Sequence, residues 1–201
     1  MFWTRFLLQV VPFSLLGLLG SLVGLWLGPQ DPGSTFMLLA GVISLLLFIA
    51  LMTFKSVLGW NVGLLAAIGL AIGVFLRALV AEAIISAWLL SAGLAVLVFA
   101  LSAWLGRRMG SRMRDVGIGL WLLSWAYLMG WGVIAFLELD PVFTTAWAGA
   151  GVLVFSGLAA AWFSSLETQL DAQPGAALGV DLFFLYLNLT IAIRVLFAGW
   201  A

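Results

Sequence analysis

Long apolar runs recur along the whole of this sequence, and they constrain its fold more than any other feature. A helix that crosses the roughly 30 Å hydrocarbon core of a bilayer needs about 20 consecutive apolar residues. Runs of this kind predict membrane spans over residues 6–28, 35–54, 58–77, 83–105, 116–137, 142–165 and 177–199. The connections between them are short. We therefore expect an all-α membrane protein, a seven-transmembrane-helix bundle that forms a single integral membrane domain over residues 1–201.

The composition excludes several functions. Hydrophobic residues make up 65% of the chain and charged residues 8%, whereas soluble domains have about 45–50% apolar and about 25% charged residues. A net charge of zero without a large basic patch excludes a nucleic-acid partner. Cysteine and histidine are absent, which removes thiol chemistry, the commonest metal ligands and the usual pH switch. We expect no metal site and no cofactor, and any pH sensing would fall to carboxylates.

The charged residues predict an orientation, because Lys and Arg collect in cytoplasmic loops. One side of the predicted spans carries the basic residues Arg5, Lys55, Arg107, Arg108, Arg112 and Arg114, and the other carries the acids Asp31, Glu138 and Asp140. The N-terminus is therefore expected in the cytoplasm. One Lys against seven Arg is typical of a GC-rich bacterial genome, which favours a bacterial inner (plasma) membrane. The arginines before Asp115 are expected to meet anionic lipid headgroups.

Small residues predict close packing of two spans. In the third span these are Gly59, Gly63, Gly69 and Gly73, and in the sixth they are Ala146, Gly149, Ala150, Gly151 and Gly157. Small residues let the backbones of membrane helices approach closely. In the first span, Pro12 predicts a kink, because proline cannot donate a backbone hydrogen bond.

The last span contains an acid, Asp181, a few residues inside its apolar run. An acid inside a membrane segment is costly and is a functional-site hypothesis by default. On a helix, Asp181, Leu185 and Asn188 share one face. Arg194 lies about 20 Å further along the axis and cannot pair with Asp181 within that helix. It is either an anchor at the membrane interface or a basic partner for another group.

Glu167 ends the sixth span, and a short turn through Pro174 and Gly175 connects it to Asp181. The turn keeps both acids on one side of the bilayer, where their side chains could meet. Two carboxylates in one partly dry site do not both ionise readily and would share a proton, forming a pH-sensitive latch. The alternative is that Glu167 and Asp171 are solvated acids and Asp181 is an interfacial acid near a helix start.

Enzyme motifs are missing. The sequence contains no HExxH, no G-x-S-x-G and no glycine-rich phosphate loop followed by Lys. The LGVD around Asp181 lacks the first glycine of the G-x-G-D that intramembrane aspartyl proteases carry. We expect that the protein is not an enzyme.

Several motifs resemble the Bax inhibitor family, also called the transmembrane Bax inhibitor motif family. FALSAW followed by Arg114-Asp115 is similar to its F-x-x-L-S run and its basic-Asp step into the next helix. FSSLETQL is similar to its aromatic-Asp-Thr-Gln signature, and YLNLTIAIRVLF is similar to its Asn-Leu and Arg-Leu ending. The resemblance covers roughly residues 60–200 and indicates a divergent, bacterial member.

The resemblance implies a seven-helix fold with the last helix central, and a pH-dependent calcium leak controlled by two acids. Glu167 stands where the first acid would be. The family's second acid would stand at Leu185, and Asp181 is one helical turn earlier on the same face. The family's basic partner in the second helix is also absent, and Lys55 is the nearest candidate.

Two functions follow as hypotheses. The first is a pH-sensitive cation leak channel, with Ca²⁺ as the transported ion and with Glu167, Asp181 and Asn188 along the ion path. The alternative is a non-conducting membrane protein that stabilises or regulates partner membrane proteins. The lipid bilayer is the expected partner in both cases, and the sequence identifies no protein partner.

Overall fold

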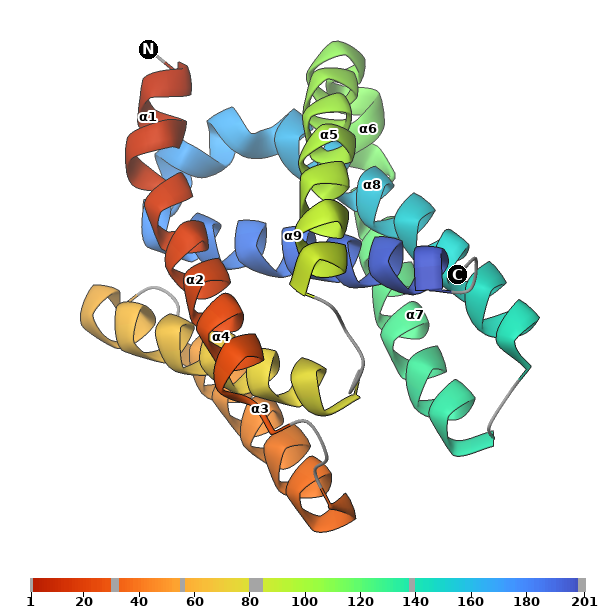
Figure 1. Ribbon diagram of the computed structural model, residues 1–201. Helices are drawn as coiled ribbons and strands as arrows, with labels where there is room; N and C mark the ends of the chain where they lie inside the picture. Colours follow the sequence, from red (N-terminus) through yellow and green to blue (C-terminus); the bar gives the residue numbers. More distant parts are fainter. Residues whose placement is uncertain (1, 30–32, 55–56, 80–84, 138–139, 199–201) are drawn as a thin grey trace. The chain divides into compact units, whose positions relative to one another are not determined.

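The computed structural model describes residues 2–29, 33–54, 57–79, 85–137 and 140–198, and within these ranges all regular secondary structure is helical (Figure 1). In chain order the helices are α1 (Phe2–Gln9), α2 (Val11–Leu27), α3 (Ser34–Phe54), α4 (Leu58–Leu79), α5 (Ile85–Met109), α6 (Ser111–Asp115), α7 (Gly117–Leu137), α8 (Pro141–Ala172) and α9 (Gly175–Ala198). The all-α prediction is therefore confirmed for the described part of the chain.

Five helices of the described chain are long and apolar enough to cross a membrane. They are Phe2–Leu27, which joins α1 and α2, then Leu58–Arg77, Ala87–Met109, Pro141–Ala172 and Gly175–Phe197. In α3 and α7 the fully described apolar stretches, Leu39–Phe54 and Gly117–Gly130, are shorter. The helices coincide with the predicted spans, and seven crossings stay a prediction.

The first span is interrupted near Pro12, as predicted. α1 ends at Gln9, a turn follows at Val10, and α2 begins at Val11 with the proline in its first turn. Proline has no N–H for the carbonyl of Leu8, and its ring would clash with that carbonyl in a continuous helix. The first turn of a helix tolerates proline because its N–H groups have no intrahelical partner there.

The helices group into two compact units. The first contains Met1–Ile84 and Gln169–Phe184, and the second contains Ile85–Thr168 and Leu185–Ala201. α8 and α9 each contribute residues to both units, so the boundary between the units does not follow a linker in the sequence.

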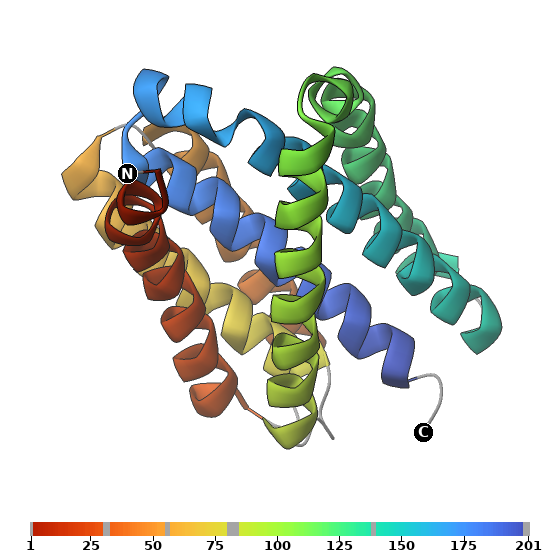
Figure 2. The same ribbon diagram turned by 90° about the horizontal axis from the view of Figure 1, so that it is seen from above.

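In the first unit, α4 packs closely against α2 and also contacts α3 (Figure 2). A side chain added at Gly73 would meet the backbone of Ser21 and lie 2.8 Å from the nitrogen of Leu25. Gly69 is likewise packed on the backbone of Gly17. The small residues thus let the two backbones approach, as membrane helices require in the absence of a hydrophobic driving force between them.

The packing prediction for the third span is correct for only half of its glycines. Gly69 and Gly73 lie against α2, whereas Gly59 and Gly63 have no atom of the described residues within 4 Å of an added Cβ. The prediction of close packing was wrong for Gly59 and Gly63, because a small-residue pattern does not show which face of a helix has a neighbour.

In the second unit, two of the three glycines predicted to pack closely in the sixth span do so, whereas an added Cβ at Gly149 would have only an ordinary contact with Leu196 at 3.9 Å. Gly151 on α8 makes room for the ring of Tyr127, and Gly157 accommodates Leu120 at 3.3 Å from an added Cβ. Tyr127 also stacks on Trp147, with ring centroids 5.5 Å apart and an interplanar angle of 8°. On α5, Gly106 lies against the backbone of Ala160.

α9 is the most enclosed of the membrane-length helices. In its most apolar stretch 72% of the residues are buried, compared with 28–33% in the corresponding stretches of the other four helices. Phe183, Leu178 and Leu189 are fully buried on it. A helix that is apolar on all sides and buried on most of them belongs in a protein interior.

Candidate functional site

Asp181 lies in the first half of α9 and is half-buried. Its neighbours along the helix, Val180, Leu182 and Phe183, are all buried. α9 is continuous from Gly175 to Ala198, so the predicted face that joins Asp181, Leu185 and Asn188 exists as a helical face. Leu185 is buried and Asn188 is half-buried. An acid and an amide therefore lie two turns apart on the most enclosed helix.

Glu167 lies in the last turns of α8 and forms an ion pair with Arg107 in the last turn of α5. The distance between Arg107 Nη2 and Glu167 Oε1 is 3.2 Å, and 68% of the Glu167 side chain is exposed. The pair becomes geometrically feasible because Gly106, the residue before Arg107, lets α5 approach the backbone of Ala160 on α8. The sequence did not indicate Arg107 as the partner of Glu167.

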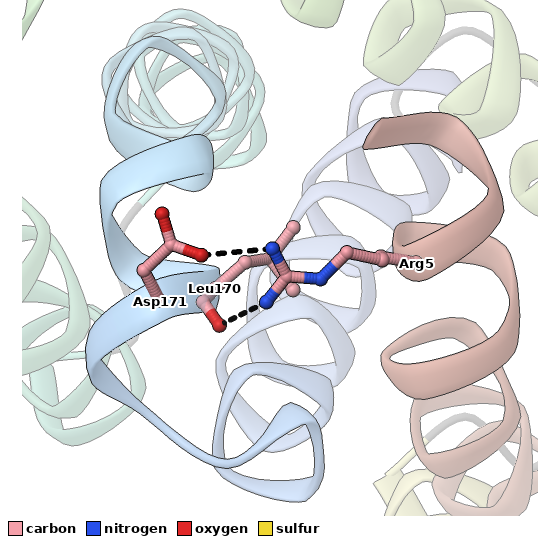
Figure 3. A network of polar contacts seen from close by, with 3 residues as sticks. All are labelled: Arg5, Leu170 and Asp171. Carbon is pink, nitrogen blue, oxygen red and sulfur yellow. Dashed lines mark hydrogen bonds and ion pairs between the residues drawn. The ribbon is translucent and has the colours of Figure 1, made fainter. Parts of the chain in front are cut away.

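Asp171, one helical turn beyond Glu167, pairs with Arg5 of α1 (Figure 3). Arg5 Nη1 donates to Asp171 Oδ1 at 2.8 Å, and Arg5 Nη2 donates to the carbonyl oxygen of Leu170 at 2.7 Å. The Leu170 carbonyl is one of the last four of α8, which have no intrahelical partner. Arg5 therefore caps the helix and neutralises an acid that the helix dipole disfavours at a C-terminus.

The predicted acids fall in different parts of the structure. Glu167 belongs to the second unit with Arg107, whereas Asp181 belongs to the first. The predicted contact between Glu167 and Asp181 therefore stays a prediction. Asp171 is 73% exposed, in agreement with its interpretation as a solvated acid. It lies in α8 and not in a loop, and Arg5 binds its carboxylate.

The two candidate basic partners have different outcomes. Lys55 lies outside the described residues. Arg194 is half-buried near the end of α9, and its Nε is buried without a hydrogen-bond partner in the described chain. The acids Glu167 and Asp171 instead use Arg107 and Arg5, the arginines at the ends of helices on the same predicted side of the membrane.

Asn61 is a buried polar residue that the sequence analysis did not single out. It is fully buried on α4, and its Nδ2 donates to the carbonyl oxygen of Ala176 in the first turn of α9, at 3.3 Å. An amide in an otherwise apolar span was the available signal, because buried polar groups in membrane helices normally bond to a neighbouring helix. Asn61 connects the start of α9 to α4.

The Arg5–Asp171 contact gives a testable stability prediction. The pair is exposed, at 42% and 73% of the two side chains, so we expect a coupling of only about 0.3–1 kcal/mol. Arg5→Gln should destabilise more than Asp171→Asn, because it also removes the donor to Leu170. Unfolding of the single and double variants in detergent measures both quantities. The control Arg5→Lys keeps the positive charge but loses the pair of guanidinium nitrogens that donate to Asp171 and Leu170 together. If Arg5→Gln and Asp171→Asn lowered the free energy of unfolding equally, the capping role of Arg5 would be contradicted.

These features define a class: an all-α protein with helices of membrane-spanning length. Three of its eight acids lie along the sequence at the end of α8 and in the first half of α9. Comparison with protein-family models and with curated proteins finds no match to this chain.

Proposed function

We propose that this chain is a polytopic membrane protein, similar to the Bax inhibitor family, that lets cations cross the membrane under the control of pH. Ca²⁺ is the proposed transported ion. The observation that supports the proposal most strongly is Asp181, a half-buried acid on the most enclosed membrane-length helix. Ionisable groups within membrane segments normally mark ion or proton pathways, because their desolvation is costly without such a role.

In the proposed path, α9 supplies oxygen atoms to the ion. Asp181 offers carboxylate oxygens and Asn188 an amide oxygen two turns further on, on the same face. Ca²⁺ prefers oxygen ligands of these two kinds. The two groups lie seven residues apart, about 10 Å along the helix axis, so they would act as successive ligands along the path and not as one site.

Glu167 is the proposed proton-sensitive partner. In the closed form Glu167 and Asp181 share a proton, and loss of that proton leaves two negative charges that repel each other. Arg107 then stabilises the ionised form of Glu167, because it already lies 3.2 Å from its carboxylate. Higher pH would therefore favour the Glu167–Arg107 pair and an open path.

The proposed topology has seven crossings, with the N-terminus in the cytoplasm of a bacterium, the protein in the inner membrane and α9 central. The high burial of α9 supports its central place.

Calcium flux into proteoliposomes, measured across a pH series, tests the role of the two acids. We expect flux to rise with pH and the double variant Glu167→Gln, Asp181→Asn to lose this dependence. The matched control is Asp140→Asn, since Asp140 accepts from the Val142 N–H at 2.7 Å and asparagine caps a helix equally well. An unchanged pH profile in the double variant would overturn the assignment. An absence of flux with a copurifying protein would favour the non-conducting alternative.

A further inference from the structure

A cluster of four arginines occupies the corner between α5 and α7. We call Arg107, Arg108, Arg112 and Arg114, which lie at the end of α5 and on α6, the arginine corner. Gly110 separates the two helices with a φ of 53°, a backbone conformation that favours glycine. None of the residues of α6 is buried. The turn therefore presents a short helix with its basic side chains accessible from outside the protein.

Most of the positive charge in the arginine corner is not neutralised by the described chain. Arg107 pairs with Glu167, whereas Arg108 lies over the ring of Trp104 at 5.2 Å, a cation–π contact that leaves its charge in place. Arg112 and Arg114 form no ion pair with an acid of the described residues. Asp115 is the one acid within the corner's own sequence, so the corner keeps an excess of positive charge.

Exposed apolar residues flank the arginines of the corner in the sequence. Trp104, Met109, Val116 and Ile118 are exposed by 56%, 41%, 50% and 75%. Exposed tryptophan beside arginine is typical of the membrane–water interface, where a ring meets the acyl chains and a guanidinium meets the headgroups. A soluble anion would use the arginines and leave these apolar groups in water. A phospholipid would contact both.

We propose that the arginine corner binds the headgroups of anionic phospholipids and that a lipid phosphate competes with Glu167 for Arg107. Guanidinium groups bind phosphate in a bidentate manner, so Arg112, Arg114 and Arg108 can each take a phosphate oxygen pair. Arg107 is 36% exposed and precedes Arg108 in the last turn of α5. The competition rests on the proposed function, because it makes anionic lipid a regulator of the Glu167 latch. The binding itself does not rest on it.

Lipid binding is tested on the purified full-length chain by native mass spectrometry, with phosphatidylglycerol and phosphatidylcholine as probes. Phosphatidylglycerol should be retained selectively. The triple variant Arg108→Gln, Arg112→Gln, Arg114→Gln should bind it roughly 100-fold more weakly, since each basic residue near a lipid surface contributes about fivefold. Asp115→Asn should tighten binding, whereas Asp140→Asn should leave it unchanged. An unchanged melting temperature checks that each variant is folded.

Two further arms complete the test. Glu167→Gln removes the carboxylate that competes for Arg107 and should increase the affinity for phosphatidylglycerol, and Arg107→Gln should abolish that increase. Equal retention of both lipids, or retention that the triple variant does not alter, overturns the site. Displacement of phosphatidylglycerol by an equal concentration of inorganic phosphate overturns the assignment to lipid. None of these measurements requires ion flux, so the lipid-binding proposal can fail while the proposed function holds, and the reverse.

Discussion

Replacing Gly73 by leucine is expected to separate α2 from α4 and to lower the free energy of unfolding by about 3 kcal/mol or more. The atoms that an added side chain would meet belong to the backbone of Ser21 and to the nitrogen of Leu25, the latter 2.8 Å away. Backbone atoms inside a helix cannot rotate aside as a flexible side chain can. The helices must therefore move apart and lose their close contact. Thermal unfolding in detergent should show a fall in Tm of roughly 10 °C.

Gly63→Leu is the matched control for this variant. Gly63 lies on the same helix, and in the part of the chain that the structure describes no atom lies within 4 Å of its added Cβ. We expect a change within about 0.5 kcal/mol, as for surface substitutions elsewhere. If Gly63→Leu and Gly73→Leu lowered the free energy of unfolding equally, α4 would tolerate leucine at neither position, and the packing argument would be contradicted. A stable Gly73→Leu protein would contradict it as well.

Asp181→Asn is expected to lower calcium flux at mildly alkaline pH by at least about tenfold. A carboxylate and a cation a few ångströms apart attract by several kcal/mol at the effective dielectric constant of a protein, and about 1.4 kcal/mol corresponds to a factor of ten. Asparagine keeps the shape and one oxygen ligand but loses the charge. The measurement is the initial rate of Ca²⁺ entry into proteoliposomes at a fixed protein-to-lipid ratio.

Two variants sharpen the Asp181 experiment. Asp181→Glu keeps the charge and should retain most of the flux, whereas Leu185→Asp in the Asp181→Asn background places an acid one turn further along the same face. Under the proposed similarity to the Bax inhibitor family, whose acid stands at that position, flux should return in the combined variant. Wild-type flux in Asp181→Asn would remove Asp181 from the ion path.

The apolar runs predicted where the membrane-length helices lie, but not where every helix ends. α8 was expected over 142–165 and continues to Ala172. Hydropathy detects the end of a lipid-facing segment, whereas a helix continues as long as its last carbonyls find partners. Here Arg5 supplies one of those partners from the other end of the sequence.

The charged contacts could not be predicted because they depend on the lateral order of the helices. The distribution of basic residues predicted Arg5 and Arg107 on the same side of the membrane, but nothing in the sequence indicated which acid each arginine would contact. The structure pairs them with Asp171 and Glu167, respectively. The same limit applies to Gly59 and Gly63, whose pattern matched that of Gly69 and Gly73 although no described atom lies within 4 Å of their added Cβ.

The most direct test of the proposed cation leak uses the unaltered chain. Purified protein is reconstituted into vesicles that contain a calcium indicator, and Ca²⁺ entry is compared with protein-free vesicles at mildly acidic and mildly alkaline pH. We predict entry above the protein-free rate, faster at alkaline than at acidic pH. Entry equal to that of protein-free vesicles at both pH values would contradict the proposal.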